Sequence, residues 1–237
     1  MDAAKQALTL IFGFDLEFWS IVGRSIWVSG SACLLASLFG LPLAGLLTVW
    51  NFPGRRFVKL FLSTLIGFPA IVVGLLILML LSRSGPLGGL GLLYSPQAMI
   101  IAQCVLVTPL IAALALQLLE RRWHELYDYL SSLGVRRRTA IFVLLHEEWR
   151  GLVIVAIGGF SRAIAELGTA MMVGGNIAGH SRVMTTAIAL EASKGNLGLA
   201  LALGLFLLLV SFGITIIVVL VRERLVGPDA FLTNHRG

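Results

Sequence analysis

Charged residues are scarce in this chain of 237 residues: they make up 13% of it, whereas hydrophobic residues make up 58%. Soluble domains carry about 25% charged residues, so this composition excludes an ordinary soluble protein and places the chain in a membrane. The length leaves room for one bundle of spanning helices with short loops. The net charge of +6 does not by itself indicate a nucleic-acid partner, because cytoplasmic loops of membrane proteins also accumulate basic residues.

Cysteine is also scarce. Cys33 and Cys104 are the two cysteines of the sequence, and both fall inside apolar runs, where a free thiol behaves as a small apolar side chain. No Cys or His stands near either of them at the spacing of a metal site. We therefore expect no disulfide, no metal and no bound cofactor.

Five apolar runs are long enough to cross a bilayer, which takes about 20 residues of helix. They cover residues 26–50, 58–81, 98–119, 152–172 and 197–221. The sequence therefore predicts an all-α transmembrane protein, a bundle of about five spans that forms one domain over residues 1–237. Residues 1–20 carry acidic side chains directly after a short apolar run, so we expect a short surface-lying helix there rather than a signal peptide.

A polar stretch at residues 120–150 separates the third run from the fourth. Placing this stretch in the cytoplasm puts most of the 18 basic residues on the cytoplasmic side, as the positive-inside rule requires. The N-terminus is then outside and the C-terminus is cytoplasmic. The basic residues on the cytoplasmic side are Arg55, Arg56, Lys59, Arg121, Arg122, Arg136, Arg137, Arg138, Arg150, Arg222, Arg224 and Arg236.

Three stretches resemble enzyme signatures, and each lacks a required residue. The glycines of residues 174–181 have the spacing of a phosphate-binding loop, but His180 stands where a lysine must reach the phosphates. The helix that would begin at His146 lacks the second histidine of a zinc protease. Residues 159–163 miss the second glycine of a nucleophile elbow. We therefore expect no catalytic residue.

Two opposite charges lie within the fourth run. Arg162 and Glu166 are four residues apart, a spacing that places them on one face of a helix and allows an ion pair. Either charge alone would be costly in hydrocarbon, so the pair should face the bundle interior or water. Two interpretations stay open: a gate or pathway element, and a structural pair that fixes the rotation of the helix.

Glycines and small polar side chains follow this pair, between residues 168 and 186. Irregular backbone at membrane depth is tolerated where it is buried in protein or lines a wet cavity, and exposed amides can approach an anion. The segment could therefore line a path for an oxyanion, or it could be an ordinary external turn. We expect residues 173–196 to be external or re-entrant, with a short helix at residues 185–192. Candidate path residues are Gly174, Gly175, Asn176, Ser181, Arg182, Thr185 and Thr186.

The polar stretch contains a pattern that resembles the cytoplasmic coupling motif of binding-protein-dependent ABC importer permeases. That motif reads Glu-Ala-Ala, three residues, Gly, nine residues, Ile-x-Leu-Pro. Gly134 matches its glycine and Asp128 stands for its acid, whereas Leu144 replaces the isoleucine and His146-Glu147 replaces Leu-Pro. The resemblance implies that residues 120–150 contact a cytoplasmic ATPase through a coupling helix near residues 130–136. The residues implied in this contact are Asp128, Tyr129, Leu130, Ser131, Ser132, Leu133, Gly134, Val135 and Arg136.

Residues 162–179 are similar to the molybdate, sulfate and tungstate permeases of that family. Residues 171–182 and 185–195 most resemble the tungstate type, because Ala178 and Thr186 stand where molybdate permeases tend to carry proline. Molybdate and sulfate permeases of the same group remain alternatives. A secondary anion carrier is the alternative from another class. Carriers usually show internal repeats and paired broken helices, and the two halves of this sequence do not echo each other.

The resemblance implies a transport subunit that is not itself an enzyme. Two permease copies would form the path between them in a prokaryotic plasma membrane. A cytoplasmic ATPase dimer would bind ATP and Mg, and an extracytoplasmic binding protein would deliver the anion.

Overall fold

The computed structural model describes residues 9, 13 and 15–226, with side chains up to residue 220. Within these residues every regular element is helical. The basic side chains of Arg222 and Arg224, all of Arg236, and most of the expected surface-lying helix fall outside what is described. The helices are α2 (Leu16–Val49), α3 (Arg55–Ile66), α4 (Ala70–Leu81), η1 (Gly88–Leu90), α5 (Pro96–Ser132), α6 (Arg137–Glu147), α7 (Trp149–Ile164), α8 (Gly168–Gly174), α9 (Met184–Ser193) and α10 (Leu197–Val226).

Helices occupy all five predicted apolar runs, but two of the runs are bent pairs of helices rather than single spans. By length and composition α2, α5 and α10 can each cross a membrane as one helix, whereas α3 with α4 and α7 with α8 form bent pairs. The bends are 101° for the first pair and 60° for the second. α2 begins at Leu16, so residues 16–20 are continuous with the helix of the first span and do not form a separate surface-lying helix.

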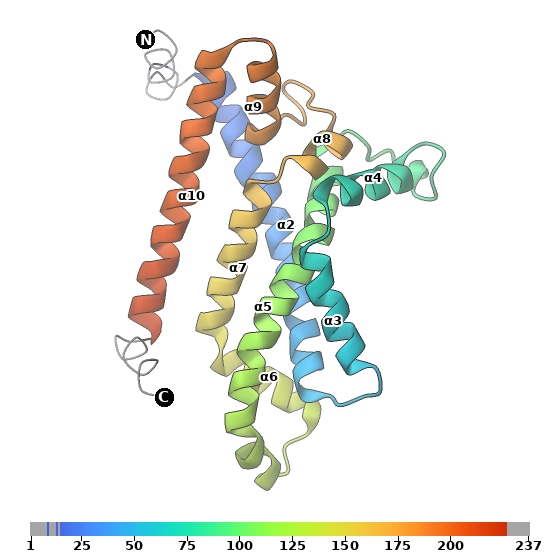
Figure 1. Ribbon diagram of the computed structural model, residues 1–237, viewed down its shortest axis with the longest axis vertical. Helices are drawn as coiled ribbons and strands as arrows, with labels where there is room; N and C mark the ends of the chain where they lie inside the picture. The colour runs from blue at the N-terminus through green and yellow to red at the C-terminus, as the bar shows by residue number, and fades with distance from the viewer. Residues whose placement is uncertain (1–8, 10–12, 14, 227–237) are drawn as a thin grey trace.

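α2 and α5 run side by side through the centre of the molecule (Figure 1). Small residues let their backbones approach closely, as in many membrane helix pairs. A Cβ atom on Gly40 of α2 would lie 3.2 Å from the carbonyl oxygen of Thr108 and 3.3 Å from the amide of Ala112 on α5. α7 joins this contact through Gly159, where a Cβ atom would lie 2.7 Å from the side chain of Ile111. The core of the bundle therefore depends on close approach of backbones.

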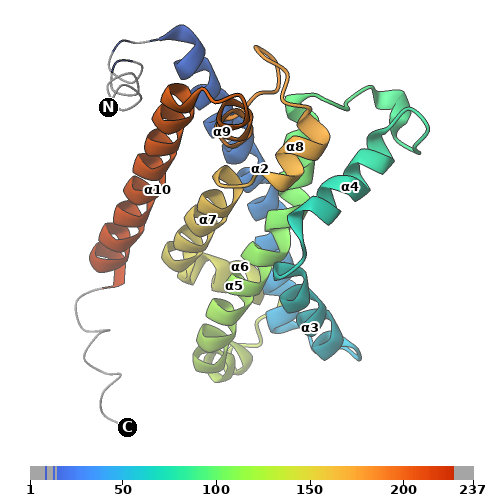
Figure 2. The ribbon, with the colours of Figure 1, turned by 45° about the horizontal axis from the view of Figure 1, so that its top comes forward.

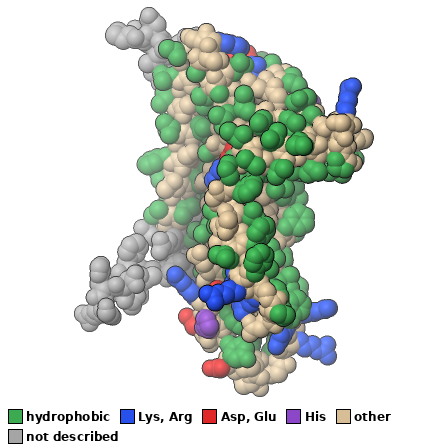
Figure 3. All heavy atoms as spheres, turned by 45° about the vertical axis from the view of Figure 1, so that its right-hand side comes forward, with side chains coloured by type: hydrophobic (Ala, Val, Ile, Leu, Met, Phe, Trp, Pro, Cys, Tyr) green, Lys and Arg blue, Asp and Glu red, His purple; other side chains and the backbone are tan. Residues whose placement is uncertain are grey.

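α10 stands at the edge of the bundle against α7 and α9 (Figures 1 and 2). Its most apolar window is 11% buried, compared with 61% for that of α5. Since its exposed side chains are apolar, α10 is suited to face lipid. In the space-filling view hydrophobic side chains cover the middle of the molecule, and most charged side chains visible on that face lie towards its ends (Figure 3).

The 120–150 stretch is helical through most of its length. α5 continues beyond the predicted span to Ser132, and a turn at residues 133–136 leads into α6. Gly134 has a φ angle of 65°, in the left-handed region that favours glycine. The residues expected to contact an ATPase are therefore the last turns of α5 and the turn itself, at the lower tip in Figure 1.

Candidate functional site

The two breaks lie beside each other and line one pocket of about 570 Å³. α4 and α8 pack side by side, as both ribbon views show (Figures 1 and 2). The contact is close because Gly74 of α4 has no side chain: a Cβ atom there would lie 2.9 Å from Met172 and 3.1 Å from Thr169 of α8. The pocket is lined by Pro69, Ala70, Ile71, Ala165, Glu166, Leu167, Gly168, Met171 and Met172.

Local chemistry explains the first break. Pro69 has no backbone N–H and disfavours helical geometry in the residue before it, so it favours the end of α3 before this point. α4 then begins at Ala70 on the far side of the bend. Neither Gly67 nor Pro69 was part of the sequence-predicted site, although the Gly-x-Pro pattern inside an apolar run is a signal that could have identified the break.

Glu166 organises the second break. Its side chain is 5% exposed, and its carboxylate accepts hydrogen bonds from the amides of Gly168 at 2.8 Å and Thr169 at 3.4 Å. These are the first amides of α8, which have no partner within that helix. Arg162 pairs with the same carboxylate. The carboxylate therefore caps the start of α8 and is linked by an ion pair to the last turn of α7.

The predicted Arg162–Glu166 ion pair is present, but it does not lie on one unbroken helix. α7 ends at Ile164, and Glu166 lies in the break. The Arg162 side chain is 43% exposed, so the cation reaches the surface while its partner is buried. An unpaired carboxylate at this depth would be costly, and the cation together with the two amides offsets that cost.

The small donors beyond α8 are engaged within the fold. The Ser181 hydroxyl, fully buried, donates to the Gly174 carbonyl and accepts from the amide of Ile177 at 3.1 Å. The Thr186 hydroxyl accepts from the amide of Val183 at 3.1 Å at the start of α9. Thr185 donates at 3.0 Å to the carbonyl oxygen of Glu166. These hydroxyls hold the segment in shape, and their contact with an anion stays a prediction.

Backbone conformation explains the glycines of this segment. Gly175, Asn176 and Gly179 have φ angles of 66°, 50° and 72°, a left-handed geometry that glycine adopts without strain and asparagine tolerates. A Cβ atom on Gly175 would also lie 2.7 Å from the Tyr94 ring. The expected helix at residues 185–192 is confirmed as α9.

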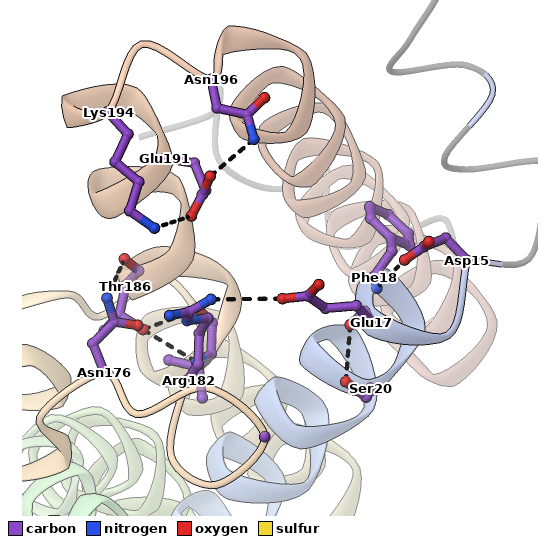
Figure 4. Close-up of polar contacts among 12 residues, drawn as sticks. Asp15, Glu17, Phe18, Ser20, Asn176, Arg182, Thr186, Glu191, Lys194 and Asn196 are labelled. Carbon is purple, nitrogen blue, oxygen red and sulfur yellow. Dashed lines mark hydrogen bonds and ion pairs between the residues drawn. The ribbon is translucent and has the colours of Figure 1, made fainter.

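Arg182 is held against α2 rather than free at an open mouth. Its side chain is 13% exposed, and one guanidinium nitrogen lies 3.6 Å from the Glu17 carboxylate (Figure 4). Arg24 of α2 fixes the backbone here by donating to the carbonyl oxygens of Arg182 and Gly179, each at 2.9 Å. The same view shows Asn176 beside Thr186, whose carbonyl oxygen accepts from the Asn176 amide at 3.3 Å. An electrostatic role of Arg182 towards an anion stays a prediction.

Residues 128–136 form one exposed surface at the tip of α5. The side chains of Tyr129 and Leu133 are 63% and 60% exposed, whereas Leu130 is 6% exposed and packs against the bundle. The amide of Val135 donates at 3.1 Å to the carbonyl oxygen of Leu130 and closes the turn. The structure thus brings the sequence-predicted coupling residues together, in a part of the fold separate from the pocket at the breaks.

Comparison with known proteins identifies a family that matches this chain. A family model described as "Binding-protein-dependent transport system inner membrane component" matches residues 36–227. The chain is 39% identical to the tungstate uptake system permease protein TupB of Peptoclostridium acidaminophilum, over 94% of this chain and 97% of the relative. It is 36% identical to TupB of Campylobacter jejuni, over 82% and 81% of the two chains. Identity to the molybdenum transport system permease protein ModB of Escherichia coli is 27%, over 87% and 93%.

Proposed function

The chain belongs to the family of binding-protein-dependent transport system inner membrane components, and on this premise we propose that it is the permease subunit of an ATP-driven tungstate importer. The observation that carries the choice of anion is the 39% identity to a tungstate uptake permease over nearly the full length of both chains. Identity to a molybdenum permease is lower, at 27%. Molybdate and sulfate remain the alternatives within the same group of oxyanions.

The pocket at the two breaks is our candidate for the translocation path. Irregular backbone at membrane depth is stable where it faces protein or a wet cavity, and both breaks line this pocket. The charged side chain that lines the pocket is Glu166, and its ion pair with Arg162 brings the net charge of the pair near zero. An importer must let its anion leave as well as enter. Weak attraction here therefore fits a passage or gate better than a tight binding site.

The remaining parts of the importer follow from the same proposal. Two copies of the permease form the path between them. The exposed surface of residues 128–136 docks on a cytoplasmic ATPase dimer, which binds ATP and Mg, so this chain needs no cofactor of its own. The opposite end, with α9, faces an extracytoplasmic binding protein. The protein then lies in a prokaryotic plasma membrane with its N-terminus outside and its C-terminus in the cytoplasm, and it has no catalytic residue.

One structural feature keeps a second candidate in view. Paired broken helices are common in secondary carriers, and this chain has two bent pairs. A carrier would transport its anion without ATP and without a binding protein. Dependence on these two partners therefore separates the two functions.

The test is oxyanion uptake into vesicles that contain the permease with its ATPase. Tungstate, molybdate and sulfate are each supplied on the binding protein, with ATP or with a non-hydrolysable analogue. We expect uptake only when ATP and the binding protein are both present, and the highest rate with tungstate. Uptake without ATP would indicate a carrier, and equal rates for the three anions would remove the choice of tungstate. Calorimetry of the binding protein with tungstate and molybdate shows whether selection occurs before the permease.

A further inference from the structure

Two charged residues near the cytoplasmic end of α5 pair with different neighbours. The Glu120 carboxylate contacts the Arg55 guanidinium at 3.2 Å and the Lys59 ammonium, both on α3. The Arg122 guanidinium lies 3.5 Å from Glu147 of α6 and 3.5 Å from Glu148, which immediately precedes α7. The part of α5 that leads to the tip is therefore linked to α3 and to the start of α7, the first halves of the two broken spans.

α3 has little else to hold it to the bundle. Leu62 is its one buried residue, whereas the side chains of Phe57, Leu60 and Phe61 are 70%, 65% and 53% exposed. Apolar packing is thus thin along this helix, although it lies against α5. The ion pairs with Glu120 therefore add to the apolar contacts that Leu62 and Val58 make with the bundle.

The two cations differ in how much they depend on Glu120. Arg55 is also held by the end of α2, because its guanidinium donates to the carbonyl oxygens of Leu47 at 2.6 Å and Thr48 at 2.9 Å. Lys59 has Glu120 as its hydrogen-bond and ion-pair partner among the described side chains. The side chains of Lys59 and Glu120 are 26% and 33% exposed, so water screens this pair in part only. The position of the Lys59 side chain therefore depends on Glu120 more than that of Arg55 does.

α3 connects this ion-pair cluster to the pocket. The helix has 12 residues, which corresponds to about 18 Å at 1.5 Å per residue. Its far end is the break before Pro69, which lines the pocket together with Glu166. A rigid helix that tilts at one end also moves at its other end. If α3 moves together with α5 at Glu120, a displacement of α5 therefore also moves the break at the pocket.

We propose that Glu120 is a positioning residue that makes α3 follow the cytoplasmic tip of α5, and so transmits ATPase motion to the break that lines the pocket. The inference rests on the proposed function as an ATP-driven importer. Glu120 contacts neither the anion nor the ATPase in this scheme. Its removal should uncouple ATP hydrolysis from uptake rather than abolish assembly.

The test measures anion uptake and ATP hydrolysis in the same vesicles, with tungstate supplied on the binding protein. Glu120→Gln keeps the size and polarity of the side chain but removes its charge. Energetic couplings between sites in proteins commonly correspond to about 5-fold to 150-fold, so we expect uptake per ATP to fall by about fivefold or more. The melting temperature and the yield of ATPase complex should stay close to those of the wild type. Lys59→Gln should show the same defect from the α3 side.

Glu125→Gln is the matched control, because Glu125 is on the same helix and pairs with Arg122 of that helix. It should leave uptake per ATP unchanged. Lys59→Arg keeps a cation beside Glu120 and should retain most of the coupling.

Each outcome is decisive. The inference is overturned if Glu120→Gln and Lys59→Gln match Glu125→Gln, or if Lys59→Arg loses the coupling as fully as Lys59→Gln while the complex assembles. It is also overturned if uptake, hydrolysis and melting temperature fall together, because that pattern indicates a purely structural role. Absence of ATP-dependent uptake in the wild type with all three oxyanions would contradict the proposed function itself, which is a different result.

Discussion

Replacing Glu166 tests the role of the buried carboxylate at the second break. Glu166→Ala removes the partner of Arg162 and the acceptor for the amides of Gly168 and Thr169. Breaking a buried ion pair on one side costs about 3–5 kcal/mol, and a hydrogen bond to a charged group contributes about 1.5–3 kcal/mol. The Arg162 side chain is 43% exposed, so it can be partly rehydrated. We therefore expect the free energy of unfolding to fall by about 3 kcal/mol.

Two further variants separate the ion pair from the helix cap. Glu166→Gln retains an oxygen for the amides but loses the charge, so it should destabilise less than Glu166→Ala. The double variant Arg162→Ala with Glu166→Ala leaves no unpaired charge, and it should be less destabilised than Glu166→Ala alone. The expected coupling between the two sites is about 1–2 kcal/mol, within the range for residues in contact.

Thermal unfolding of the detergent-solubilised permease measures these differences. For a chain of this length, 1 kcal/mol corresponds to a shift in melting temperature of about 2–4 °C. Glu166→Ala should therefore melt about 6–12 °C below the wild type. Additive effects of Arg162→Ala and Glu166→Ala would show that the two side chains do not interact, and would refute a stabilising role of this ion pair at the break.

Three other predictions concern separate parts of the chain. Gly134→Val forces a β-branched residue into a φ angle of 65°, which costs about 1–3 kcal/mol. The amount of ATPase that co-purifies with the permease should fall, whereas membrane insertion should be retained. An unchanged yield of co-purified ATPase together with unchanged transport-coupled hydrolysis would contradict this prediction. Arg182→Glu should lower anion uptake steeply and Arg182→Gln less, because like charges in a low-dielectric path repel. Glu17→Gln is the control, since it removes the same ion pair but keeps the cation. An equal fall in anion uptake in all three variants would assign Arg182 a structural role. The hydrogen bond from Lys194 holds the pKa of Glu191 below its ordinary value of 4.5. The stabilisation of the fold by the ionised Glu191 is therefore complete above pH 4.5 and is lost as the pH falls through the lowered pKa. Glu191→Gln should make the melting temperature depend less on pH below 4.5.

Hydropathy was sufficient to predict the five apolar helical segments, because the length of an apolar run is a local property of the sequence. It could not predict that two of these segments bend. The break before Pro69 has a local signal in Gly67 and Pro69. The break at Glu166 has no proline or glycine within it. It depends on a carboxylate that accepts the first amides of α8, which spacing alone does not reveal.

The candidate site was only partly predictable for a similar reason. The Arg162–Glu166 pair follows from residues four apart, so sequence spacing was enough. Ser181 and Thr186 looked like free donors, but their hydroxyls have partners within a few residues, and a sequence shows donors without showing what satisfies them. Contacts such as Glu120 with Lys59 join residues 61 positions apart, so no local pattern indicates them.

The right-angled bend between α3 and α4 also changes how the molecule fits its bilayer. If α3 follows the membrane normal, α4 lies nearly in the membrane plane, because the two helices meet at 101°. α3 then covers at most about 18 Å of a hydrocarbon core that is about 30 Å thick, because its first five residues include three cations. Hydrophobic mismatch costs a fraction of a kcal/mol per Å, so a deficit of at least about 12 Å strains the lipid by a few kcal/mol. A second copy packed against this side would relieve that strain, and the membrane itself would then favour pairing of the permease.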